Sequence, residues 1–117
     1  MSNRAKLNVT TPSKLFLFAT IRIKPEYFEQ ARAALDGLMP PTLAEVGCHV
    51  FSAFQSQDQD NTLHLFECFD DMDALNAHYA ADYTKEVFTA YEEWLAAPVE
   101  VTKLSAISST TSAQFGV

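Results

Sequence analysis

The order of apolar and polar residues along the chain predicts four β-strands. Residues 15–23 alternate between an aliphatic face and a face that runs from aromatic to polar. Two apolar runs, 48–55 and 62–69, flank the polar segment QSQDQDN and predict an antiparallel hairpin. A fourth run, 98–107, leads into a polar segment rich in serine and threonine. The chain is therefore predicted to form a sheet with a central hairpin.

Apolar residues at helical spacing predict two helical regions between these strands. Pro25, with acidic residues in the turn that follows, marks a helix start. Pro40 and Pro41 are expected to end that helix. Asp70 and Asp71 supply a cap for a second helical region, in which a helix through Tyr79 is followed by another helical stretch that continues to about residue 95. The buried stripe of the first helix is predicted to consist of Phe28, Ala31, Leu35 and Leu38.

The predicted order is strand, helix, strand, strand, helix, strand. This is the split βαβ arrangement of a ferredoxin-like α+β domain, in which an antiparallel sheet carries its helices on one face. With 117 residues the chain has room for one core. We expect a loose arm over residues 1–13, the folded domain over 14–108 and a polar tail over 109–117.

A sheet with helices on one face leaves its other face bare. We expect that face to carry Phe16, Phe18, Phe51 and Phe69, which is a large exposed apolar patch. A second copy of the chain, packed sheet to sheet, would cover it. The sequence therefore predicts a homodimer.

Charge and composition narrow the class of partner. The formal net charge is −7, and the eight Lys and Arg residues are scattered, which argues against nucleic acid and against a polybasic membrane patch. No apolar run approaches the ~20 residues of a membrane span, and no secretory cleavage site follows the first strand. We expect a cytoplasmic protein that binds a small apolar or aromatic molecule. Cys48 and Cys68 fall inside predicted strands and are expected to be buried, unpaired thiols.

The candidate chemistry centres on Glu67, which interrupts an apolar strand between Phe66 and Cys68. A carboxylate there indicates that one face of the strand lines a cleft. Burial would raise its pKa toward neutrality, and a histidine, His78, follows in the next helix. If the hairpin turn centres near residue 58, the residue numbers of two cross-strand partners add up to about 116, and His49 faces Glu67. Glu67, His78 and His49 are thus the candidate catalytic residues.

The walls of the cleft are predicted from residues on the same strands. Phe51, Leu65 and Phe69 share the face of Glu67 in the predicted register. Phe16 and Phe18 are expected to form the wall from the first strand, although packing at the dimer interface is the alternative for Phe16. Arg22, near the end of that strand, is a candidate to hold an anionic substrate oxygen or to pair with a surface carboxylate.

Other interpretations of these residues remain open. Glu67 fits a structural ion pair, and His78 fits a hydrogen bond to the backbone or to Glu67. The set His49, Glu67 and His78 has the composition of a two-histidine, one-carboxylate metal triad, but no compact ligand spacing supports it, so no metal is expected. His78 is the one candidate axial ligand for haem. With three glycines in the chain, there is no glycine-rich loop for a nucleotide cofactor.

Two segments, AEVGCHVF and LHLFECFDDMDALNAH, resemble the antibiotic biosynthesis monooxygenase family of dimeric α/β-barrel proteins. The matching positions are Glu45, Gly47, Glu67, Phe69, Ala74, Leu75 and His78, and the resemblance covers about residues 15–107. Phe69 stands where the family usually has tryptophan. The resemblance implies oxygenation of phenols, anthrone-like polyketides or quinols without flavin, haem or metal. Relatives on this fold also include isomerases, haem-degrading enzymes and stress proteins.

The favoured hypothesis is a cofactor-independent monooxygenase that oxidises a small aromatic, polyketide or quinol substrate. Glu67 and His78 would supply the base and the group that orients the substrate. Two alternatives are a non-catalytic dimeric module that binds a hydrophobic metabolite or acts in a stress response, and an isomerase or degrading enzyme on the same scaffold.

Overall fold

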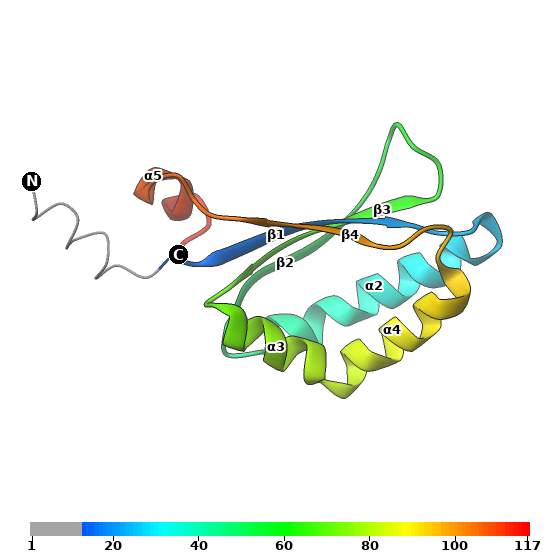
Figure 1. Ribbon diagram of the computed structural model, residues 1–117, viewed down its shortest axis with the longest axis horizontal. Coiled ribbons are helices and arrows are strands. Elements are labelled where there is room, and N and C mark those ends of the chain that lie inside the picture. Colours follow the sequence, from blue (N-terminus) through cyan, green and yellow to red (C-terminus); the bar gives the residue numbers. More distant parts are fainter. Residues whose placement is uncertain (1–12) are drawn as a thin grey trace, which may run out of the picture.

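The computed structural model describes residues 13–117, so all but the last residue of the predicted N-terminal arm lies outside the described residues. Figure 1 shows a layer of strands with helices beneath it. In chain order the elements are β1 (Leu15–Arg22), the 3₁₀ turn η1 (Pro25–Tyr27), α2 (Phe28–Leu43), β2 (Cys48–Gln55), β3 (Thr62–Phe69), α3 (Met72–Ala80), α4 (Asp82–Trp94), β4 (Glu100–Leu104) and α5 (Ser109–Ala113).

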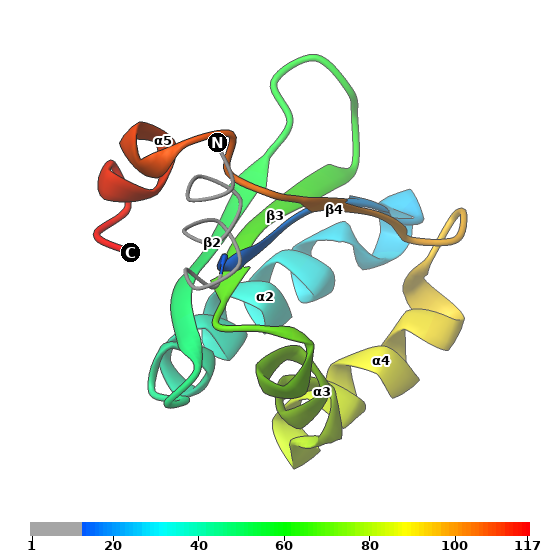
Figure 2. The same ribbon diagram turned by 60° about the vertical axis from the view of Figure 1, so that its left-hand side comes forward.

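The strands form one antiparallel sheet in the order β2-β3-β1-β4. Helices α2, α3 and α4 all cover the same face of this sheet, as both ribbon views show (Figures 1 and 2). The second predicted helical region is divided into α3 and α4 at Ala81, whose backbone is extended. The ferredoxin-like α+β fold is confirmed.

The register of the strands decides which side chains face the helices. Leu17 on β1 and Phe51 on β2 both lie opposite Glu67 on β3. Because partners in register share a face, the aliphatic side of β1 lies on the covered face together with Glu67. In the β2–β3 hairpin the residue numbers of paired residues have a sum that is larger by two than predicted, so Phe51 lies opposite Glu67 in place of His49. An irregularity between Cys48 and Val50 also interrupts the ladder at the start of β2. The predicted pairing of His49 with Glu67 is therefore wrong.

The face of the sheet away from the helices carries a different set of aromatic residues from the predicted one. Phe51 and Phe69 are buried on the covered face. Phe16 lies on the open face, where the rings of Phe66 and Phe115 pack against it with centroids 6.0 Å and 5.6 Å away. Phe18, Phe54, Leu104 and Phe115 remain substantially exposed. An apolar open face is thus present, and the homodimer stays a prediction.

Two further local expectations need correction. Helix α2 continues through Pro40 and Pro41 and ends at Leu43. Each proline lacks the N–H that would bond to the carbonyl four residues earlier, but less than one turn of helix follows Pro41. Thr42 donates its hydroxyl to the Leu38 carbonyl at 2.7 Å. The segment predicted as a polar tail contains the short helix α5 and brings Phe115 onto the open face of the sheet. Among residues 13–117, no helix combines the length and the hydropathy needed to cross a bilayer.

Gly47 lets the segment before β2 pass closely over helix α3. A Cβ at this position would lie 2.5 Å from the Cβ of Ala74, well inside van der Waals contact. The Gly47 carbonyl also accepts a hydrogen bond from the Asp70 amide at 2.9 Å. The first turn of α3 is therefore fixed against this glycine.

We predict that Gly47→Ala lowers the free energy of unfolding by about 1–3 kcal/mol, because α3 must move away from the new methyl group. Gly37→Ala is the matched control: Gly37 lies on the exposed side of α2 with no atom within 4 Å of its added Cβ. That change should stabilise the protein by about 0.5–1 kcal/mol through helix propensity. Chemical denaturation of both variants measures the difference, and equal effects would contradict the close approach.

Candidate active site between the sheet and helices α3 and α4

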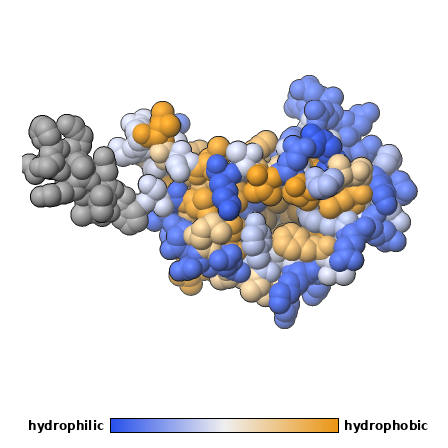
Figure 3. All heavy atoms as spheres, in the orientation of Figure 1, coloured by the Kyte–Doolittle hydropathy of each residue, from blue (hydrophilic) through white to orange (hydrophobic). Residues whose placement is uncertain are grey.

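A cavity of about 330 Å³ lies between the covered face of the sheet and the helices α3 and α4. In Figure 3, apolar side chains gather over the region between β4 and these helices, with hydrophilic side chains around them. Such a volume and such a lining are typical of sites for small organic molecules. The lining residues are Ala19, Ile21, Leu38, Phe51, Leu65, Glu67, His78, Tyr79, Thr84, Val87, Phe88, Tyr91, Glu92, Leu95, Val99 and Val101.

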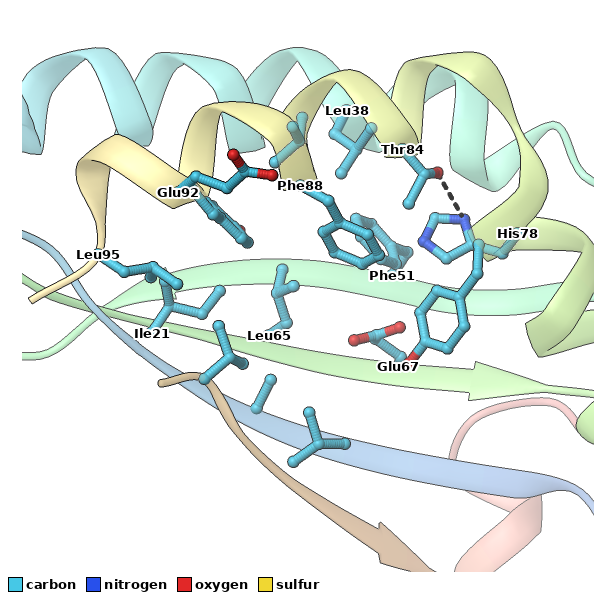
Figure 4. Close-up of a pocket in the computed structure, with 16 residues that line it drawn as sticks. Ile21, Leu38, Phe51, Leu65, Glu67, His78, Thr84, Phe88, Glu92 and Leu95 are labelled. Atoms are coloured by element: carbon cyan, nitrogen blue, oxygen red, sulfur yellow. Dashed lines mark hydrogen bonds between the residues drawn. The ribbon is translucent and has the colours of Figure 1, made fainter. Parts of the chain in front are cut away.

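Glu67 is the buried carboxylate of this cavity. It lies in the middle of β3 and is 6% exposed. Figure 4 shows its side chain rising from the strand into the space below Phe51 and His78. Burial, and secondarily the charge of Glu45, raises the pKa of Glu67 to about 7. Near neutral pH this carboxylate can therefore accept a proton from a bound molecule.

His78 reaches the same cavity from helix α3. That helix begins at Asp71, whose side chain accepts the Ala74 amide at 2.9 Å. Leu75 packs into the core, and His78, three residues later, lies on the same side of the helix. The imidazole is 3% exposed, and its ring centroid lies 5.4 Å from that of Phe51 and 5.3 Å from that of Phe69.

The two ring nitrogens of His78 have different surroundings. Nδ1 lies 2.9 Å from Oε2 of Glu45 and 3.5 Å from the hydroxyl of Thr84. Figure 4 shows the other nitrogen, Nε2, directed toward the cavity rather than toward Thr84. The imidazole is therefore anchored on one side and offers its second nitrogen to a ligand.

Sequence reasoning missed several residues of this site. Glu45 belongs to the family-like segment AEVGCHVF but was assigned no role in the site, and Tyr83, which donates its hydroxyl to Glu45, was not singled out. Tyr79 and Tyr91 also line the cavity. Burial, and then the charge of Glu67, raises the pKa of both tyrosines, so both keep their hydroxyl protons. Only the tertiary structure brings these residues together.

His49 does not lie beside Glu67. It occupies the irregular start of β2, where its Nε2 lies 2.6 Å from Oδ1 of Asp70. The hydrogen bonds from His49 and Lys14 lower the pKa of Asp70. The predicted support of Glu67 by His49 is wrong, because the register of the β2–β3 hairpin places Phe51 opposite Glu67. In the part of the chain that the structure describes, no three His, Cys, Asp or Glu side chains gather into a set that could hold a metal ion.

The predicted wall residues divide between the two faces of the sheet. Phe51 and Leu65 line the cavity, and Phe69 lies behind the ring of His78. Phe16 and Phe18 lie on the open face, so their predicted place in the cavity wall is wrong. The register of β1 with β3 puts them there.

Arg22 is likewise absent from the cavity lining. Its Nη1 donates to Oε2 of Glu100 at 2.6 Å, which confirms the alternative of pairing with a surface carboxylate. Cys48 and Cys68 are buried, unpaired thiols, as predicted. Burial is the main cause that raises the pKa of each, to about 12 for Cys48. Neither thiol is therefore a nucleophile at neutral pH.

The fold and the cavity define an α+β domain of the ferredoxin-like class with an apolar cavity between its sheet and its helices. The chain belongs to the antibiotic biosynthesis monooxygenase family, whose model matches residues 15–90. "Putative monooxygenase Rv0793" of Mycobacterium tuberculosis is 29% identical over 100 residues, which make up 86% of this chain and 98% of that protein.

Two solved structures and one more relative extend this comparison. The structure of Rv0793 superposes with a TM-score of 0.77 and 30% identity, covering 82% of this chain and 97% of that one. The crystal structure of PA3566 from Pseudomonas aeruginosa gives a TM-score of 0.77 at 25% identity, covering 82% and 96%. The uncharacterized protein sll1783 of Synechocystis is 29% identical over 90 residues, or 77% of this chain, and the chain spans 60% of its length.

The raised pKa of Glu67 predicts a pH-dependent stability. In the unfolded chain this carboxyl loses its proton near 4.5, whereas in the folded protein it does so near about 7. Between these values the folded state binds more protons, so the free energy of unfolding falls as the pH rises. The total contribution is about 3 kcal/mol, present in full at acid pH and lost above neutrality.

Glu67→Gln removes this titration. We predict that the stability of the variant relative to the wild type rises by about 3 kcal/mol between about pH 4 and about pH 8, and stays constant above that range. Urea unfolding at a series of pH values measures it. If the difference in the free energy of unfolding between Glu67→Gln and the wild type does not change with pH, the Glu67 carboxylate is solvated.

Proposed function

We propose that this protein is a cofactor-independent monooxygenase for a small, neutral, hydroxylated aromatic molecule. The observation that carries the proposal is a carboxylate with a pKa of about 7, buried at the wall of an apolar cavity of about 330 Å³. Membership in the antibiotic biosynthesis monooxygenase family supports oxygen chemistry. A fused aromatic system of two or three rings suits a site of this size.

The reaction needs no external reductant. For an anthrone-type substrate, a base removes a proton from the methylene carbon, and the resulting carbanion transfers an electron to molecular oxygen. Recombination forms a carbon–oxygen bond, and loss of water from the hydroperoxide leaves a carbonyl group. One oxygen atom ends in the product and the other in water, which takes up both methylene hydrogens. Four electrons leave the carbon and reduce both oxygen atoms.

Glu67 is the proposed base, and His78 the proposed group that orients the substrate. The carboxylate of Glu67 is half ionised near pH 7, which suits a proton acceptor that must release its proton again. Nε2 of His78, directed into the same cavity, would accept a hydrogen bond from a substrate hydroxyl. The apolar walls would keep water away from the carbanion.

We expect oxygen uptake with anthrone or a hydroquinone, with an atom of ¹⁸O₂ recovered in the product. Glu67→Gln and His78→Gln should each lower kcat/KM by about 10²- to 10⁴-fold. In the wild type, kcat/KM should rise with pH around about 7 because the ionised base is the active form, and Glu67→Gln should abolish that rise.

The matched controls are Glu26→Gln, on the protein surface, and His64→Gln, whose ring stacks on Phe18 on the open face. Both should keep wild-type activity. Binding of anthrone or the hydroquinone to the wild type without oxygen uptake would favour the non-catalytic ligand-binding module. Turnover that survives Glu67→Gln would remove Glu67 as the base.

The charges of the lining predict a preference for neutral substrates. Glu67 lies in the cavity wall and Glu92 at its exposed edge, and no Lys or Arg is among the lining residues. A substrate carboxylate would meet like charge without a partner, which is unfavourable in an apolar site. At about pH 8 we expect a neutral anthrone to bind at least about tenfold tighter than its carboxylated analogue. Calorimetric titration measures both affinities, and the difference should shrink in Glu67→Gln.

A further inference from the structure

Glu45 is a partly buried acidic residue that lies outside the cavity lining and yet contacts a residue inside it. It follows helix α2, in the short connection to β2, and its side chain is 19% exposed. Its Oε2 atom lies 2.9 Å from Nδ1 of His78 on α3. The connection after α2 is thereby joined to the helix that carries the histidine.

The same oxygen of Glu45 has a second partner. The Tyr83 hydroxyl, on α4, donates a hydrogen bond to Oε2 of Glu45 and lies 3.4 Å from the carbonyl oxygen of Pro41. Burial, and then Glu45, raises the pKa of Tyr83 to about 12, so this hydroxyl keeps its proton and stays a donor. Tyr83 thus holds the carboxylate of Glu45 in place from a third element.

These contacts determine where the proton of a neutral His78 resides. An ionised carboxylate only accepts hydrogen bonds, so the nitrogen facing Glu45 must carry the hydrogen. In the neutral imidazole the lone pair then belongs to Nε2, the nitrogen that Figure 4 shows directed toward the cavity. A carboxylate that fixes the tautomer of a working histidine is a recurrent arrangement in enzymes.

We propose that Glu45 is a positioning residue, held by Tyr83, that keeps His78 in its Nδ1–H tautomer and so presents Nε2 to the cavity as a hydrogen-bond acceptor. The tautomer is a property of the free protein. Its effect on turnover rests on the proposed function.

Glu45 also acts on the second ionisable group of the cavity. Its charge is the secondary cause, after burial, that raises the pKa of Glu67. Besides His78, the other titratable groups around this pair are Tyr79 on α3, Tyr83 and Tyr91 on α4, and Cys48 on β2. Burial is the main cause that raises the pKa of each of these four, so all four are neutral at physiological pH. Removing the charge of Glu45 should therefore lower the pKa of Glu67.

Two substitutions separate these two effects. Both hydrogen bonds are made to one oxygen, so Glu45→Gln can accept both through its carbonyl oxygen while losing the charge. Glu45→Ala loses the acceptor as well. We expect Glu45→Gln to keep the Nδ1–H tautomer and to lower the midpoint of the Glu67 titration. We expect Glu45→Ala to convert His78 to a mixture or to the Nε2–H form.

The measurement is the long-range ¹H–¹⁵N correlation spectrum of histidine-labelled protein at the high-pH end of the histidine titration, together with ¹³C titration of Glu67. An Nε2–H tautomer in the wild type overturns the proposal without any variant, and so does an Nδ1–H tautomer that persists in Glu45→Ala. Glu26→Ala, on the surface, is the control and should leave the spectrum of His78 unchanged.

Kinetics with anthrone distinguish this proposal from the proposed function. If the wild type turns over substrate, Glu45→Ala should lower kcat about ten- to a hundredfold, and Glu45→Gln should restore most of that loss. A wild type that shows the expected tautomer and no turnover supports the positioning role and contradicts the proposed function. Unchanged kcat in a Glu45→Ala variant whose tautomer has switched overturns the catalytic part of the inference.

Discussion

The structure is organised around the cost of keeping one carboxylate, Glu67, on the covered face of the sheet. Its neighbours across the strands are Leu17 and Phe51, which offer it no hydrogen bond. A charged group in such a place is unfavourable unless it is paired or takes up a proton, and the raised pKa of Glu67 is the second of these outcomes. If the core closed over this side chain, further burial would raise its pKa further. The cavity beside Glu67 therefore helps to keep its pKa near neutral pH, where the carboxylate can act as a base.

The division of the second helical region gives this cavity its polar wall. Ala81 has an extended backbone and both ends α3 and precedes α4, so the chain turns sharply between His78 and Tyr83. Residues on both sides of this turn then reach Glu45, which lies in the connection between α2 and β2. Gly47, two residues later, allows α3 to pack closely enough for the contact to form. The position of His78 thus depends on three segments that are distant in the sequence.

The two faces of the sheet have separate properties. The covered face combines aliphatic strand residues with Glu67, and the open face carries aromatic residues that include Phe16 and Phe18. Phe115 from the C-terminal segment packs onto the open face, so that segment contributes to the surface on which a second copy is predicted to pack. The proposed ligand site and the predicted dimer surface therefore lie on opposite sides of one layer. A substitution on the open face would leave the residues that line the cavity unchanged.

The sequence by itself determined the strands, the helical regions, the ferredoxin-like class and the residues Glu67 and His78. These follow from local signals: alternation in strands, spacing in helices, and one acidic residue in an apolar run. Alternation also predicted the two faces of β1, but it did not predict which of these faces lies on the same side of the sheet as Glu67. Alternation has a period of two and carries no information on the pairing of β1 with β3, so Phe16 and Phe18 were assigned to the wrong wall. The predicted pairing of His49 with Glu67 fails because the hairpin turn centres one residue later than predicted, so Phe51 takes that place. Only the tertiary structure decided that Glu45 contacts both His78 and Tyr83, since contacts between residues 33 and 38 positions apart leave no periodic pattern in the chain.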